Sequence, residues 1–191
     1  AMLPAITFFV TCIDHSFHDF TATATIVVSD PLAGDPNPGN NTLVSSPSTT
    51  AVLRTSDLKV NSAMVGAPAT AITNTPFNVT VDASLHDNGP DPAPANVTVT
   101  LTLPPDCSAP GNPRTVPVSL PVSTATSLPT QTFSVTCTSR SGHTFSATVE
   151  IVGPVHVVDP NGGNNSTTSA GVTVGVFDQS DLKVTGVTVT S

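Results

Sequence analysis

One stretch of this sequence occurs twice, and the repetition limits the architectures that the chain can adopt. Residues 3–12 read LPAITFFVTC and residues 128–137 read LPTQTFSVTC, so their cysteines lie 125 positions apart (137 − 12). The motif Ser-Asp-Leu-Lys-Val occurs at 56–60 and again at 180–184, 124 positions apart (180 − 56), so one residue is lost in between. Self-similarity at a fixed period is the signature of tandem modules.

Further matches lie between the cysteines and the Ser-Asp-Leu-Lys-Val motifs. The matching pairs are His18 and His143, Phe20 and Phe145, Ala22 and Ala147, Ile26 and Ile151, Asp35-Pro-Asn37 and Asp159-Pro-Asn161, and Asn40-Asn41 and Asn164-Asn165. We therefore predict a tandem repeat of about 125 residues. In this division, 1–56 is the C-terminal half of one module, 57–180 is a complete module, and 181–191 is the first strand of a following module.

The composition and the apolar pattern favour an all-β fold. Only 9% of the residues are charged, 19 are proline, and Trp and Tyr are absent, whereas long helices need Leu, Glu and Lys in quantity. Apolar and polar residues alternate in several short stretches, most regularly over 77–87. A period of two indicates strands with one face toward a core and the other toward water.

About seven such stretches, separated by short Pro- and Gly-rich turns, predict an Ig-like antiparallel β-sandwich. The connections are too short for parallel crossovers, so we expect antiparallel pairing. In the half-module, the alternation predicts strands over 7–12 and 18–28. The predicted core consists of Phe77, Val79, Val81, Val97, Val99, Leu101, Phe133, Val135, Phe145, Val149 and Val174.

The three cysteines fit one disulfide per module. Cys107 and Cys137 lie 30 positions apart (137 − 107) in the complete module, and we expect them to be bridged. Cys12 is the repeat counterpart of Cys137, so its partner would be a cysteine of a neighbouring repeat. A bridge between Cys107 and Cys12, or two buried free thiols, are the alternatives. A disulfide framework indicates an extracellular protein.

The charge balance and the scarcity of reactive groups exclude several function classes. A net charge of −8 with only five Lys and Arg residues argues against nucleic acid and anionic membrane surfaces as partners. No apolar run approaches the roughly 20 residues of a transmembrane helix. The first ten residues lack a positively charged segment, so we expect any signal peptide to lie outside this chain. Glu150 is the only glutamate, and no nucleophile elbow is present, so we predict no enzymatic activity.

Two kinds of loop offer oxygen atoms to a cation. The calcium candidates are Asp159, Asn161, Asn164 and Asn165, their copies Asp35, Asn37, Asn40 and Asn41, and a second set of Asp87, Asn88 and Asp91. Ca²⁺ takes such hard oxygen ligands. Asp and Asn also cap their own turns, and this alternative explains the loops without a metal. We expect no cofactor apart from calcium bound weakly at these loops.

Five N-x-[ST] sequons are candidates for glycosylation. They lie at Asn40, Asn78, Asn96, Asn164 and Asn165. The alternation places Asn78 and Asn96 on outward faces, where carbohydrate could be attached. A Thr-rich β-protein also generates this triplet by chance.

Four motifs occur in a fixed order in the complete module. They are Asp57-Leu-Lys-Val60, His86-Asp-Asn-Gly-Pro90, Asn96-Val-Thr-Val-Thr-Leu-Thr-Leu-Pro104 and Asp159-Pro-Asn-Gly-Gly-Asn-Asn165. This order resembles the Ig-like repeats of bacterial and archaeal surface proteins, including the cell-adhesion-related domain and its N-x-G-P-containing relatives. The resemblance implies extracellular tandem arrays that act as stalks, adhesins or fibres, and it supplies no catalytic residues. The cysteine pair and the Pro-rich insert at 104–130 depart from the simplest form of these repeats.

These observations predict an extracellular structural module of a surface filament, fibre or stalk. Its partners would be other copies of itself, in a longer tandem array or a homopolymer. The half-module would be completed by covalent continuation of the array or by strand donation between subunits. The alternative is an adhesin that binds a carbohydrate or a protein, although sugar sites usually use Trp or Tyr, and both are absent.

Overall fold

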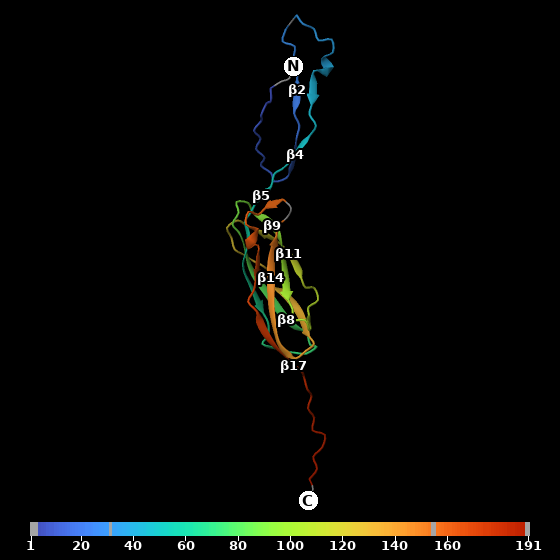
Figure 1. Ribbon diagram of the computed structural model, residues 1–191, viewed down its shortest axis with the longest axis vertical. Coiled ribbons are helices and arrows are strands. Elements are labelled where there is room, and N and C mark those ends of the chain that lie inside the picture. The colour runs from blue at the N-terminus through green and yellow to red at the C-terminus, as the bar shows by residue number, and fades with distance from the viewer. Residues whose placement is uncertain (1–3, 31, 154–155, 190–191) are drawn as a thin grey trace. The chain divides into compact units, whose positions relative to one another are not determined.

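A computed structural model describes residues 4–30, 32–153 and 156–189 (Figure 1). The chain divides into a first unit, Ala1–Arg54, and a second unit, Thr55–Ser191. Parts of the predicted half-module and of the predicted following strand, 1–3 and 190–191, lie outside the described residues. Regular structure in the described part of the chain consists of strands and two single-turn 3₁₀ helices, η1 (Pro38–Asn40) and η2 (Gly162–Asn164).

One sheet of the second unit is built around β8, the long alternating strand of the sequence. Strand β6 pairs with one edge of β8, strands β12 and β13 pair along the other edge, and β10 pairs with β13, all antiparallel. The strands of this sheet are β6 (Leu58–Gly66), β8 (Phe77–Asp87), β10 (Cys107–Ser108), β12 (Thr126–Ser127) and β13 (Gln131–Cys137).

The other sheet has the order β11-β9-β14-β17-β7, with β16 also paired with β14. Its strands are β7 (Thr70–Ile72), β9 (Ala93–Thr102), β11 (Arg114–Leu120), β14 (Ser141–Val152), β16 (Ser166–Thr168) and β17 (Val172–Phe177). The two sheets face one another, as expected for an Ig-like β-sandwich (Figure 1). The short strands β5 (Arg54–Thr55) and β15 (Val157–Val158) lie outside both sheets.

One strand pair departs from the expected antiparallel arrangement, because β7 runs parallel to β17. Short connections exclude parallel pairing only for strands that follow one another in the same sheet. The chain instead leaves the first sheet after β6 and enters the second sheet as β7, beside the last strand of the unit. No crossover connection is therefore needed for this parallel pair.

The predicted core is confirmed in its composition and register. Phe133, Val135, Phe145 and the other predicted core residues are at most 2% exposed, apart from Phe77, which is half-buried. The ring of Phe77 packs edge-on against Phe145, with centroids 5.9 Å apart. Thr100, on the opposite face of β9, is exposed. The period-two alternation thus identified the buried face of the sandwich.

The first unit forms shorter strands than we predicted. Its strands are β1 (Phe17–Phe20), β2 (Thr23–Thr25), β3 (Thr42–Val44) and β4 (Ser48–Ala51), and β1 pairs with β4 while β2 pairs with β3. The predicted strand over 7–12 is not formed, and the predicted strand over 18–28 is reduced to β1 and β2. In the second unit the equivalent strands β13 and β14 are held by β8 and β9, and the first unit contains no counterpart of these two strands among its described residues.

Residues 178–189 follow β17 as an extended segment without strand pairing among the described residues (Figure 1). The predicted first strand of a following module falls in this segment. Its apolar side chains Leu182, Val184, Val187 and Val189 are 81–91% exposed. No helix in the described part of the chain is long and apolar enough to cross a membrane.

Candidate functional site

Side chains from two loops hold the start of β6, and we call these side chains together with Asp57 the Asp57 clasp. Asp57 precedes β6, Asn88 follows β8, Asp159 follows β15, and Asn164 ends η2. The Asn164 Nδ2 group donates to Asp57 Oδ1 at 3.0 Å, and Asn88 Nδ2 donates to Asp57 Oδ2 at 3.0 Å. Both oxygens of the Asp57 carboxylate therefore accept a side-chain hydrogen bond. These bonds lower the pKa of Asp57 below its usual value of 3.8, with the Asn164 bond as the largest cause.

Asp159 completes the clasp by binding the backbone of β6. Its Oδ2 accepts the N–H of Leu58 at 3.0 Å and the Nδ2 group of Asn165 at 3.0 Å. Its Oδ1 accepts the N–H of Asn161 at 2.9 Å, which closes an Asx turn. The carboxylate of Asp159 thus joins the loop between β15 and β16 to β6, 101 positions earlier in the sequence.

The glycine of the His86-Asp-Asn-Gly-Pro90 motif allows the Asn88 loop to approach this strand. A Cβ atom at Gly89 would lie 2.3 Å from Ser56 Cα and 2.5 Å from Asp57 N. Both neighbours are backbone atoms and cannot move aside easily. Only glycine therefore brings the Asn88 amide within hydrogen-bond distance of Asp57.

The predicted calcium candidates of the second unit serve this clasp. Asp159 accepts the Leu58 N–H of β6 and the Asn161 N–H, and Asn164 and Asn88 both donate to Asp57. Asp87, at the end of β8, is fully buried and accepts the Gly89 N–H through Oδ1 at 2.8 Å. The buried oxygens of this region that have no hydrogen-bond partner among the described residues are Ser56 Oγ, Asp87 Oδ2, Asn164 Oδ1 and Asn165 Oδ1. A cation at Asp159 would compete with the three N–H donors that the carboxylate already accepts.

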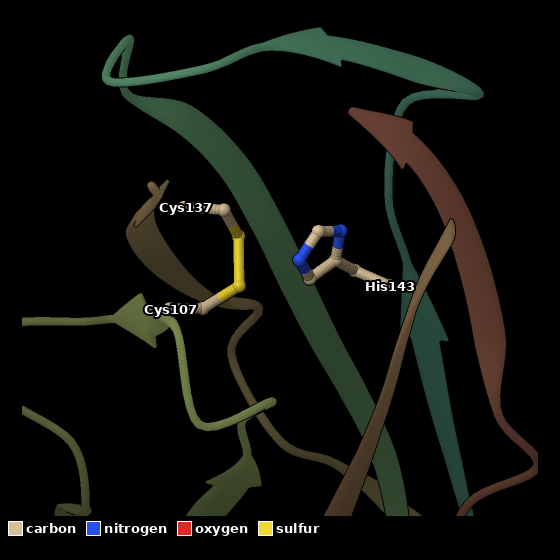
Figure 2. A group of neighbouring side chains, drawn as sticks. All are labelled: Cys107, Cys137 and His143. Carbon is tan, nitrogen blue, oxygen red and sulfur yellow. A yellow bond between two sulfur atoms is a disulfide. The ribbon is translucent and has the colours of Figure 1, made fainter. Parts of the chain in front are cut away.

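A second cluster lies at the edge of the sandwich, where Cys107 of β10 and Cys137 of β13 form a disulfide. The two residues are directly opposite one another in the antiparallel pair. Figure 2 shows the imidazole ring of His143, from β14, beside the disulfide. His143 is 3% exposed, and its Nε2 lies 2.7 Å from Asp106 Oδ2. This hydrogen bond is the main cause that lowers the pKa of Asp106 below 3.8.

Cys107, Cys137 and His143 also form a group with metal-ligand geometry. One sulfur or nitrogen atom of each lies within 4.8 Å of the others. Thiolates bind metals, and the disulfide withdraws both sulfurs from that role. The contact joins two sheets, since the cysteines lie on β10 and β13 and His143 lies on β14, so no spacing in the sequence indicates it.

In the first unit, the loop that corresponds to the clasp has kept its local structure. Asp35 Oδ1 accepts the N–H of Asn37 at 2.9 Å, as Asp159 does for Asn161. Helix η1 occupies the place of η2, with Asn40 at the position of Asn164. Among the described residues of this unit, no counterpart of Leu58 reaches the Asp35 carboxylate.

The first unit also has an open apolar groove of about 1080 Å³. Its apolar lining includes Ile6, Phe8, Val10, Phe20, Ala22 and Leu43. Phe8 and Val10 are 75% and 61% exposed, whereas their counterparts Phe133 and Val135 are completely buried in the second unit. The equivalent side chains of the second unit lie in the core between its two sheets.

The remaining predicted site residues lie as follows. The sequons Asn40, Asn78 and Asn96 are exposed, whereas the Nδ2 groups of Asn164 and Asn165 are engaged in the clasp. An N-linked sugar at either of the latter two would replace one Nδ2 hydrogen and would compete with the clasp for that nitrogen. Cys12 is a partly exposed free thiol, and the Cys107–Cys137 bridge leaves it without Cys107 as a partner.

The solved structures that are similar to part of this chain include two of one domain. One is a solution NMR structure of the CARDB domain of a Pyrococcus furiosus protein, with 19% identity and a TM-score of 0.39, covering 65% of this chain and 97% of that one. The other is a crystal structure of the same domain in complex with di-metal ions, with 20% identity and a TM-score of 0.37, covering 65% of this chain and 96% of that one. No family model and no curated protein sequence matches this chain.

Proposed function

We propose that this chain is a structural, non-catalytic part of an extracellular surface filament, fibre or stalk built from Ig-like modules. The observation that carries the proposal is the apolar groove of the first unit. Its lining repeats core residues of the second unit, yet Phe8 is 75% exposed where Phe133 is buried. An apolar surface of this kind marks an interaction site, and neighbouring repeats have the strands that would cover it.

Other features of the molecule support this role. The Cys107–Cys137 bridge suits an oxidising compartment, and the net charge of −8 disfavours nucleic acid as a partner. Covalent continuation of the array and strand donation between subunits would both complete the first unit. In a continuous array, Cys12 would pair with a cysteine of a neighbouring repeat.

Electron microscopy of the native material tests the proposal. We expect an antibody raised against the second unit to label fibres or stalks on the cell surface. Label on dispersed particles, with no extended assembly, would contradict the structural role.

An adhesin that binds a carbohydrate or a protein is the second candidate, and the exposed phenylalanines of the first unit favour it. Phe9 is 99% exposed and Phe17 is 62% exposed, so the unit offers aromatic surface without Trp or Tyr. Binding of the chain to a glycan array, lost on Phe9→Ala substitution, would support this function. Absence of binding by the wild-type chain would leave the structural role as the remaining candidate function.

A further inference from the structure

Strand β6 shows which groups a first strand contacts inside a complete module. Besides its pairing with β8, it packs on β14, β16 and η2. Leu58 and Val60 are buried, and the alternation then shifts at a bulge between Val60 and Ser62. After the bulge, Ala63 and Val65 are the residues packed against the core. The buried face of β6 therefore follows a pattern with one extra residue in the middle.

The segment 181–189 carries the same pattern. It begins with Asp181-Leu-Lys-Val184, as β6 begins with Asp57-Leu-Lys-Val60. Its next apolar residues, Val187 and Val189, fall at the positions of Ala63 and Val65, so the alternation shifts at the same place. We call residues 181–189 the Asp181 segment. Its apolar residues are exposed, and their spacing is that of the buried face of β6.

The first unit offers counterparts of the surfaces that β6 contacts apart from β8. Strands β1 and β2 correspond to β14, β3 to β16, and η1 to η2. The strand pairs of the two units have the same register. The pair Phe17–Ala51 corresponds to Gly142–Gly175. The pair Thr23–Val44 corresponds to Thr148–Thr168. The docking surface is therefore present in its local geometry, next to the open groove.

We propose that the Asp181 segment of one copy docks on the first unit of a second copy, at the Asp35 loop and the apolar groove. This inference rests on the proposed function and names the partner of the groove. Asn40 Nδ2 donates to the Asp181 carboxylate, and the Leu182 N–H donates to the Asp35 carboxylate. Leu182, Val184, Val187 and Val189 cover part of the groove. The observed contacts of Asp57 and Leu58 with Asn164 and Asp159 are the template for both polar contacts.

Sedimentation equilibrium of the 191-residue chain tests the docking. We expect concentration-dependent association that Leu182→Asp weakens about 10- to 100-fold, because a leucine side chain loses its apolar burial. The matched control is Thr188→Asp, which adds the same charge at the counterpart of Met64, a residue 68% exposed on β6. Both substitutions lie in an exposed, unpaired segment, so folding of the second unit is unaffected. Association that both variants retain equally would overturn the proposal.

A double-mutant cycle tests the polar contact itself. We expect Asp181→Ala and Asn40→Ala each to weaken association roughly tenfold, and the double variant to be little weaker than either one. Additive effects would overturn the pairing of Asp181 with Asn40.

The result also separates this inference from the proposed function. A wild-type chain that stays monomeric at all accessible concentrations overturns docking between copies, whereas labelled fibres in native material would still support the array. Tail-dependent association of the purified chain together with dispersed native material would support the docking and contradict the filament.

Discussion

Residues 4–54 and residues 129–178 have matching sequence patterns and the same strand register, yet only the second segment is buried. Both contain an Asp-Pro-Asn loop, a single-turn helix and a hydrogen bond from an isoleucine N–H to an asparagine carbonyl, Ile26 to Asn41 and Ile151 to Asn165. The backbone N–H of Ala22 donates to Ser45 Oγ at 2.9 Å, and that of Ala147 donates to Ser169 Oγ at 3.0 Å. The local structure therefore does not depend on the rest of the sandwich.

The difference between the two segments lies in strand length and burial. In the second unit β14 is a single strand of twelve residues held by β9, whereas the first unit has the two short strands β1 and β2 at the equivalent positions. Turn residues and nearby hydrogen bonds determine register over a few residues. A long, buried strand also needs partners from distant parts of the chain, and a two-stranded ribbon alone is at best marginally stable.

Hydrogen exchange should show the largest difference between the segments. The Ile26 and Ile151 amides make equivalent hydrogen bonds of 2.9 and 2.8 Å. We expect the Ile151 amide to be protected by the global stability of its sandwich, and the Ile26 amide to exchange at least roughly a thousandfold faster. Nuclear magnetic resonance at a concentration where the chain is monomeric measures both rates. Equal protection would mean that the first unit is stable without a partner.

Substitution of matched phenylalanines should give the next largest effect. Phe133→Ala should destabilise the second unit by about 3–5 kcal/mol, because the side chain is completely buried. The matched change Phe8→Ala should alter the stability of the monomeric chain by less than about 0.5 kcal/mol, since that ring is 75% exposed. Urea unfolding followed by circular dichroism measures both. A comparable loss from Phe8→Ala would contradict the open core of the first unit.

Removal of the disulfide should cost somewhat less. Cys107 and Cys137 close a loop with a sequence separation of 30, for which the chain-entropy estimate is about 3–4 kcal/mol. We expect the double variant Cys107→Ser, Cys137→Ser to lose stability of this order in urea unfolding. The control Cys12→Ser changes a thiol outside any bridge and should leave the monomer unchanged. An equal loss from the control would assign Cys12 a structural role.

The Asp57 clasp should contribute a smaller amount. Asn164→Ala removes a hydrogen bond to a carboxylate and should cost about 1–2 kcal/mol in the second unit. The matched change Asn40→Ala should have no effect on the monomer, because no first strand is docked there. Thermal unfolding measures the stability of both variants. If Asn164→Ala leaves the stability unchanged, as Asn40→Ala should, the contribution of the clasp is contradicted.

Acid titration should give the smallest effect. The pKa of Asp57 is lowered in the folded chain from 3.8, so its contribution to stability is complete above the unfolded value. This contribution is lost as the pH falls below 3.8 through the folded pKa. Asp57→Asn should reduce the loss of unfolding free energy at acid pH, which we call the acid limb, by less than about 1 kcal/mol, since the group is near solvent. The control Asp181→Asn, in the exposed segment, should leave the limb of the monomer unchanged. Stability measured between pH 2 and pH 6 tests both variants, and an identical acid limb for Asp57→Asn and wild type would contradict the clasp.

Much of the sandwich followed from patterns within the sequence. The alternation around Val79 and Val97 identified the buried faces, because a strand turns successive side chains to opposite sides. The position of Cys107 relative to Cys137 indicated the pair that the disulfide joins. In contrast, the sequence did not predict the parallel pairing of β7 with β17 or the loss of a strand over 7–12.

The sequence by itself determined the buried faces and the turn loops, because each depends on residues that are close in the chain. Only the tertiary structure brought Asp159 to Leu58 across 101 positions, and His143 to Asp106 across 37. It also showed that Phe8 and Phe133, with the same local pattern, differ completely in burial. Burial is a property of the partner strands as much as of the residue itself, and a local pattern cannot report whether those strands are present.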